Sequence, residues 1–216
     1  MSVDFNTHLT VFLMFIIPML FAITLHEAAH AYVAKLRGDQ TAYFMGRVSL
    51  NPIKHIDVLG TIILPSAMFL TGMGFLFGWA KPVSVNLNNL KKPCQDSILV
   101  ALSGPFANFI MAVMWFLLWK FIPNFGFHQM AQFGIVLNLM LAVFNLLPIP
   151  PLDGSRIVSA LLPYKITLKY NRFERWGFLI VLILLLIPCG QSNLLGSILI
   201  PIVNQLYWLI QFIFGG

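Results

Sequence analysis

Six runs of apolar residues, most of them close to the length needed to cross a lipid bilayer, constrain this chain more than any other feature. They lie at residues 9–34, 58–79, 98–122, 130–147, 176–188 and 194–214. A spanning α-helix needs about 20 such residues. Hydrophobic residues make up 59% of the 216 residues and charged residues only 9%, which leaves too little polar surface to enclose a soluble globule. The sequence therefore predicts an all-α polytopic membrane protein.

Basic residues gather in the loops that follow the first, second and fourth apolar runs. Short loops rich in Lys and Arg normally stay in the cytoplasm, but the loop after the second run would face outside if every run crossed. Pro65, Gly72, Gly74 and Gly78 interrupt the second run, which favours a re-entrant segment. We therefore expect about five transmembrane helices plus one re-entrant segment at 58–79, an outside N-terminus and a cytoplasmic C-terminus.

The rest of the composition argues for one membrane domain. Internal repeats and a separate soluble domain are absent from the sequence, so residues 1–216 are expected to form a single integral-membrane domain. The net charge of +6 comes from the short basic loops, and no aromatic and basic motif typical of nucleic-acid binding is present. We expect the lipid bilayer, and no nucleic acid, among its partners, and the oligomeric state stays open.

Two histidines and a glutamate lie inside the first apolar run, where ionisable side chains are costly and usually mark function. In the stretch His26-Glu27-Ala28-Ala29-His30, the two histidines are four residues apart. On a helix this spacing places them about 40° apart around the axis and roughly 6 Å along it, so both imidazoles can reach one metal ion. Glu27 can reach a water bound to that metal and act as its general base. The pattern is typical of zinc proteases.

A hydrolytic zinc site has three protein ligands and one open position, so His26 and His30 need a third partner. Asp153 is the best candidate, because it ends an apolar run just after three prolines, where an unpaired carboxylate would be costly. It also lies just ahead of Arg156, on the side where the first helix ends. The alternative for Asp153 is an ion pair with Arg156 or a cap on the following helix.

Three sequence patterns resemble the site-2 protease family of intramembrane zinc metalloproteases, peptidase family M50, in its compact form without a PDZ or CBS domain. They are His26 to His30 on one predicted helix, Gly104-Pro105-Phe106-Ala107-Asn108 on another, and Asn145-Leu146-Leu147-Pro148 continuing through Leu152-Asp153-Gly154. The resemblance implies one Zn²⁺ per chain, with His26, His30 and Asp153 as ligands and Glu27 as catalytic base.

The resemblance also implies that Asn145 lies near the metal and binds substrate or stabilises the oxyanion. The alternative for Asn145 is a hydrogen bond to backbone that Pro148 leaves unpaired. Gly104 and Pro105 are expected to serve helix packing, Asn108 to link helices, and His55 to lie in a loop with an open role. The alternation of apolar and polar residues in 81–90 predicts a short interfacial β-strand onto which an extended substrate could add.

The expected function is that of an intramembrane zinc metalloendopeptidase acting in regulated intramembrane proteolysis. It would hydrolyse peptide bonds in or near transmembrane segments of other membrane proteins. We expect a multi-pass protein of a bacterial or archaeal cytoplasmic membrane, with the active site near the cytoplasmic face. Two alternatives remain: a metalloprotease whose third ligand is Glu174, and a divalent-metal transporter that uses the same ligand cluster as a transit site.

Overall fold

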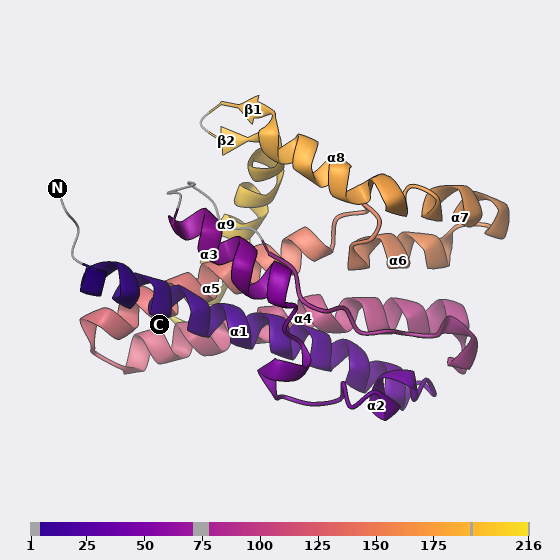
Figure 1. Ribbon diagram of the computed structural model, residues 1–216, viewed down its shortest axis with the longest axis horizontal. Helices are drawn as coiled ribbons and strands as arrows, with labels where there is room; N and C mark the ends of the chain where they lie inside the picture. The colour runs from indigo at the N-terminus through magenta and orange to yellow at the C-terminus, as the bar shows by residue number, and fades with distance from the viewer. Residues whose placement is uncertain (1–4, 71–77, 191, 216) are drawn as a thin grey trace.

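The computed structural model describes residues 5–70, 78–190 and 192–215, and helices dominate it (Figure 1). In the described part of the chain, four helices are long and apolar enough to cross a bilayer. They are α1 (Phe5–Leu36), α4 (Pro93–Phe121), α5 (Phe125–Asn145) and α9 (Leu194–Phe214). The prediction of an all-α polytopic membrane protein is therefore confirmed, and the helices begin and end within a few residues of the apolar runs.

Helix α5 lies at the centre of the bundle, where it packs against α1, α4 and α9. Its buried residues Ile135 and Leu139 belong to the main apolar core, together with Trp115 and Phe116 of α4. Trp115 covers Gly134, where a Cβ atom would lie only 2.6 Å from the indole ring. Close contact between α4 and α5 therefore depends on the missing side chain at Gly134.

A fifth apolar helix, α8 (Glu174–Leu186), has only 13 residues, fewer than a straight crossing requires. It ends where Pro188 interrupts the run, and a two-stranded turn of β1 (Pro188–Cys189) and β2 (Ser192–Asn193) follows. Asn193 then begins α9 by accepting a hydrogen bond from the backbone N–H of Gly196 at 2.7 Å. Among the described residues, four helices are long enough to span a bilayer, and the shorter helix α8 lies where a fifth crossing was expected.

The C-terminus lies at the end of the bundle opposite to the one that the topology predicted. Helix α4 runs antiparallel to α1, since His30 contacts Val100 and Ala22 contacts Asn108. Lys120, in the last turn of α4, donates a hydrogen bond from Nζ to the carbonyl oxygen of Phe214 at 2.9 Å. The end of α9 therefore lies beside the end of α4 and on the side where α1 begins.

The predicted re-entrant segment begins with a π-helix, η2 (Val58–Ile63), which continues into α3 (Leu64–Leu70). Residues 71–77, including Gly72 and Gly74, lie outside the described residues. After them, the N–H of Trp79 donates to the carbonyl oxygen of Gly60 at 3.2 Å, and the Thr61 hydroxyl donates to the carbonyl oxygen of Trp79 at 2.8 Å. The chain thus leaves and returns at one place, which agrees with a segment that re-enters and does not cross.

Short elements connect the long helices at the end of the bundle where α1 ends. They are α2 (Thr41–Phe44), the 3₁₀-helices η1 (Pro52–Lys54) and η3 (Leu87–Asn89), α6 (Asp153–Leu161) and α7 (Tyr164–Asn171). The strand expected at 81–90 is not formed, because its last part is the helix η3 and the backbone N–H groups of Val83 and Asn86 donate to the carboxylates of Glu27 and Asp39. Its first part is irregular and has no partner strand among the described residues.

Candidate metal centre

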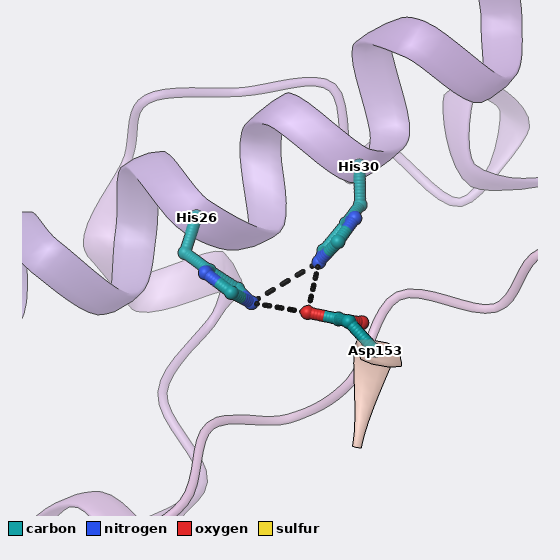
Figure 2. A group of neighbouring side chains, drawn as sticks. All are labelled: His26, His30 and Asp153. Carbon is teal, nitrogen blue, oxygen red and sulfur yellow. Dashed lines mark hydrogen bonds and ion pairs between the residues drawn. The ribbon is translucent and has the colours of Figure 1, made fainter. Parts of the chain in front are cut away.

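Two imidazoles from α1 and one carboxylate from the start of α6 meet at a single point (Figure 2). His26 Nε2 lies 3.2 Å from Asp153 Oδ2, and His30 Nε2 lies 3.1 Å from the same oxygen. The two Nε2 atoms are 3.1 Å apart. All three side chains are buried. The structure therefore brings together the three residues that the sequence predicted as metal ligands.

Hydrogen bonds on the far side of each imidazole determine which nitrogen faces the cluster. His26 Nδ1 lies 2.6 Å from Oδ1 of Asn108, and His30 Nδ1 lies 2.7 Å from the carbonyl oxygen of Val100. The amide nitrogen of Asn108 donates to the carbonyl oxygen of Ala22 and to Oδ1 of Asn138, so its oxygen is left for His26. Both neutral imidazoles therefore carry their proton on Nδ1 and direct an Nε2 lone pair into the cluster.

The convergent lone pairs fit a zinc ion. With both imidazoles neutral and protonated on Nδ1, the two Nε2 atoms and the carboxylate oxygen, about 3.1 Å apart, have no proton between them, which is unfavourable unless a cation lies among them. Tetrahedral zinc with bonds of about 2.0–2.1 Å places its ligand atoms roughly 3.3 Å apart. The three atoms thus form nearly one face of such a tetrahedron, which leaves the fourth position open, as in a catalytic site.

Gly104 of α4 lies directly against the two imidazoles. A Cβ atom there would lie 2.3 Å from His30 Nε2 and 2.7 Å from His26 Nε2. The sequence suggested a packing role for Gly104, and the structure shows that the side chains packed against it are those of His26 and His30. The Gly104 and Asn108 pattern therefore serves the site in two ways, since the glycine makes room for the imidazoles and the asparagine orients one of them.

Asp153 reaches the histidines because the loop after α5 turns tightly back on that helix. At Gly154 a Cβ atom would lie 2.1 Å from the carbonyl oxygen of Leu146, so only glycine permits this contact. Tyr170 of α7 donates its hydroxyl to the carbonyl oxygen of Pro148 at 2.8 Å and supports the same loop. Asp153 pairs with His26 and His30, whereas Arg156 is exposed. The alternative of an ion pair between Asp153 and Arg156 is therefore wrong.

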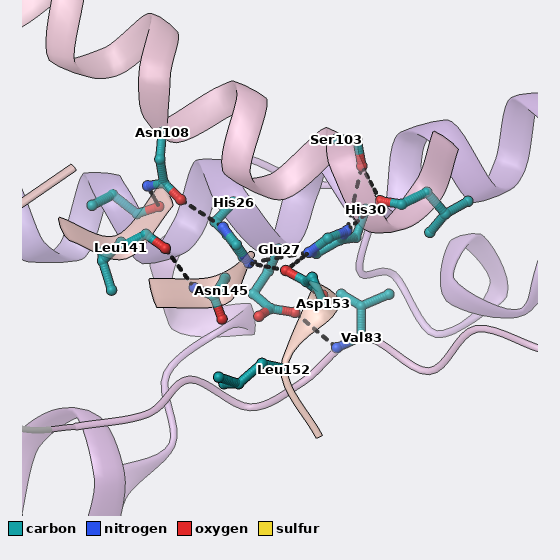
Figure 3. A network of polar contacts seen from close by, with 12 residues as sticks. His26, Glu27, His30, Val83, Ser103, Asn108, Leu141, Asn145, Leu152 and Asp153 are labelled. Atoms are coloured by element: carbon teal, nitrogen blue, oxygen red, sulfur yellow. Dashed lines mark hydrogen bonds and ion pairs between the residues drawn. The ribbon is translucent and has the colours of Figure 1, made fainter. Parts of the chain in front are cut away.

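Glu27 lies one residue along α1 from His26 and is partly buried. Figure 3 shows its carboxylate between the ligand cluster and the backbone of Val83. The N–H of Val83 donates to Glu27 Oε2 at 2.8 Å. This contact between residues 56 positions apart has no sequence signal, because it depends on how an irregular segment lies against α1.

Asn145 ends α5 and is partly buried. Its Nδ2 donates to the carbonyl oxygen of Leu141, one turn earlier in the same helix, at 3.0 Å. Asn145 thus bonds to the backbone, as its alternative role required. The acceptor is the carbonyl oxygen of Leu141, however, and not a backbone group that Pro148 leaves unpaired. One of its two N–H groups remains for another acceptor, so its catalytic role stays a prediction.

His55 makes its described contacts within the loops that precede and follow the re-entrant segment. Its Nε2 lies 2.8 Å from the carbonyl oxygen of Ser49, and its own carbonyl oxygen accepts from the N–H of Lys81 at 3.0 Å. The side chain is fully buried. These contacts give His55 a structural role in holding the loops together.

Comparisons with known proteins agree with this geometry. The family model of peptidase family M50 matches residues 120–188, which include Asn145 and Asp153. The Bacillus subtilis protein named "Putative zinc metalloprotease YwhC" is 41% identical over 186 residues, which cover 82% of this chain and 81% of that protein. Rip2 of Mycolicibacterium smegmatis, with the same descriptive name, is 30% identical over 195 residues, which cover 84% of this chain and 70% of that protein. No solved structure matches the chain.

Proposed function

The chain belongs to peptidase family M50, and from this membership we propose that it hydrolyses peptide bonds in or near the transmembrane segments of other membrane proteins. It is an integral membrane protein and a zinc metalloprotease of the site-2 protease type. The observation that carries the proposal is the buried cluster of His26 and His30 on α1, a candidate membrane span, and Asp153 at the start of α6, with Glu27 beside it. Its role is regulated intramembrane proteolysis.

His26, His30 and Asp153 hold the zinc ion in this proposal. Zinc, when bound, supplies a Lewis acid that polarises a water molecule and the scissile carbonyl and lowers the pKa of that water towards 7. Glu27 is held at Oε2 by the Val83 amide, which leaves Oε1 to take a proton from the attacking water. The same atom then returns the proton to the nitrogen of the leaving amine.

Asn145 is the second proposed catalytic residue. One N–H of its amide is used on Leu141, and the other can donate to the oxyanion that develops on the scissile carbonyl. A donor of this kind in a site that excludes water is typically worth about 10²–10³ in rate. The proposal therefore separates Asn145 from the zinc ligands, because its loss lowers catalysis without removing the metal.

We place the active site near the cytoplasmic face of a bacterial or archaeal cytoplasmic membrane. His30 is followed within two turns by Lys35 and Arg37, and α6 carries Arg156 just after Asp153. Positive residues around the site favour the cytoplasmic side. Relatives in Bacillus subtilis, in mycobacteria and in the archaeon Methanocaldococcus jannaschii support the choice of organisms.

The test is cleavage of a panel of single-span membrane proteins by the purified enzyme in liposomes, with bound zinc measured on the same samples. Glu27→Gln is expected to retain zinc and to lose cleavage, because the amide cannot accept the proton. Asn124→Ala, which removes a cap at the far end of α5, serves as a remote control and should cleave normally. Cleavage by Glu27→Gln at the wild-type rate would contradict the proposed role of Glu27.

A further inference from the structure

An irregular segment, residues 80–86, runs along the end of α1 that carries the site. Val83 is its point of contact: its N–H donates to Glu27, while its buried side chain packs on Ala31, one turn further along α1, and on Ala42. The segment thus contacts the proposed base through its backbone and the helix surface next to that base through its side chain. What fixes the segment in this place also fixes the Glu27 carboxylate.

Asp39, just after the end of α1, is the group that fixes it. Its fully buried carboxylate accepts the N–H of Asn86 on Oδ2 at 2.7 Å and the side-chain amide of Asn89 on Oδ1 at 3.0 Å. The N–H and hydroxyl of Thr41 donate to Oδ1 at 3.0 and 2.5 Å. Asp39 is itself tied to α1 through its N–H, which donates to the carbonyl oxygen of Ala34 at 2.9 Å.

Gly38 provides a second observation, independent of Asp39, that the turn after α1 lies in close contact with the chain that follows residues 80–86. Its φ is +112°, and a Cβ atom there would lie 2.9 Å from the carbonyl oxygen of Asn89. The N–H of Lys91 donates to the carbonyl oxygen of Arg37 at 3.0 Å. The backbone that follows the segment therefore lies directly on the turn that contains Asp39.

We propose that Asp39 is a positioning residue, which holds residues 80–86 against α1 so that the Val83 amide presents Glu27 Oε2 to the metal site. The inference rests on the proposed function, since it concerns the base of that reaction. Within the described residues, Asp39 is hydrogen-bonded neither to the proposed ligands nor to Glu27. Its partner Asn86 lies three residues along the chain from Val83. Three residues of extended chain span at most about 10 Å, so loosening Asn86 also loosens Val83.

The proposal is tested with Asp39→Asn, Val83→Pro and the double variant, each in liposomes with a single-span substrate. Asp39→Asn keeps the side-chain shape but replaces one accepting oxygen with a donor, so either Asn86 or the Thr41 and Asn89 pair loses its acceptor. Val83→Pro removes the N–H that holds Glu27. Each single variant is expected to lower kcat about 10-fold or more, since a misplacement near 1 Å can cost up to 10²-fold.

The double variant separates positioning from general support of the fold. If Asp39 acts through the Val83 amide, Asp39→Asn lowers kcat less than two-fold in the Val83→Pro background, and bound zinc stays at the wild-type level in all three. Backbone amide hydrogen exchange should quicken at residues 83–89 in Asp39→Asn and stay unchanged in α4 and α5. Asn124→Ala, the remote cap control, should alter neither kcat nor exchange in this segment.

Two results would overturn the inference: multiplied losses in the double variant, or wild-type kcat in Asp39→Asn. Loss of zinc from Asp39→Asn would also overturn it, since the residue would then support the metal site itself. Failure of the proposed function gives a different result, because the wild type would then cleave no substrate, or Glu27→Gln would cleave as fast as the wild type. Hydrogen exchange would still report whether Asp39 holds residues 83–89. The two failures are therefore distinguishable in one set of proteins.

Discussion

Replacement of Gly104 with alanine should prevent zinc binding at the proposed site without disturbing helix α4, which contains Gly104. The new Cβ would lie 2.3 Å from His30 Nε2 and 2.7 Å from His26 Nε2, whereas ordinary contacts of a Cβ begin at 3.4 Å. At least one imidazole must therefore move by about 1 Å, which is several times the roughly 0.2 Å that zinc–ligand distances tolerate. We expect zinc affinity to fall roughly 100-fold or more, and cleavage to fall with it.

The assay is zinc content after dialysis against graded chelator, together with thermal unfolding. Alanine favours helix over glycine by about 1 kcal/mol, so helix propensity alone would make Gly104→Ala more stable and loss of zinc cannot be attributed to it. Gly126→Ala is the matched control, because its Cβ would meet Met14 at an ordinary 3.5 Å. Wild-type zinc affinity in Gly104→Ala, with the helix intact, would refute the geometry from which the prediction is made.

Three further predictions concern Asn108 and Asn145, near the cluster, and Asp39, beyond the end of α1. Asn108→Ala removes the acceptor for His26 Nδ1 and should weaken zinc binding about 10- to 100-fold by chelator competition, while unchanged affinity would contradict its role. Asn145→Ala should lower kcat about 10²-fold and leave zinc content at the wild-type level, and loss of zinc would show that it supports the metal. Burial alone would raise the pKa of Asp39, but hydrogen bonds from Thr41, Asn89 and Asn86 hold that pKa below its ordinary value. Its stabilising effect is therefore present above about pH 4 and is lost as the pH falls further, so the difference in melting temperature between wild type and Asp39→Asn should shrink in acid and not in base.

The three residues of the cluster could be predicted from the sequence because each leaves a local signal. His26 and His30 are spaced for one helix face, and Asp153 is an acidic residue at the end of an apolar run. The apolar runs likewise predicted the positions of α1, α4, α5 and α9. Local signals of this kind survive folding, since helix period and the cost of buried charge do not depend on which helices become neighbours.

The contacts that orient the ligands could not be predicted, because they depend on helix rotation and on irregular backbone. Asn108 was visible as a polar residue in an apolar run, but nothing in the sequence aimed its oxygen at His26. The Val83 amide contacts Glu27 because residues 80–86 form an irregular segment, bound to Asp39, in place of the predicted strand. The side on which the chain ends was also mispredicted. The apolar run 176–188 was counted as a crossing because of its composition, although helix α8 has only 13 residues.

The three residues of the cluster come from two parts of the chain, α1 and the start of α6, and α4 packs against both. His26 and His30 lie on α1 and Asp153 begins α6, while Gly104 and Asn108 lie on the face of α4 that meets the histidines. A carboxylate and two lone pairs buried at one point oppose this packing until a cation joins them. A zinc ion bound by these residues would offset the unfavourable charge arrangement and link α1 to α6. Because α4 contributes no ligand and only shapes and orients the other two, substitutions on its inner face should alter metal affinity before they alter the fold.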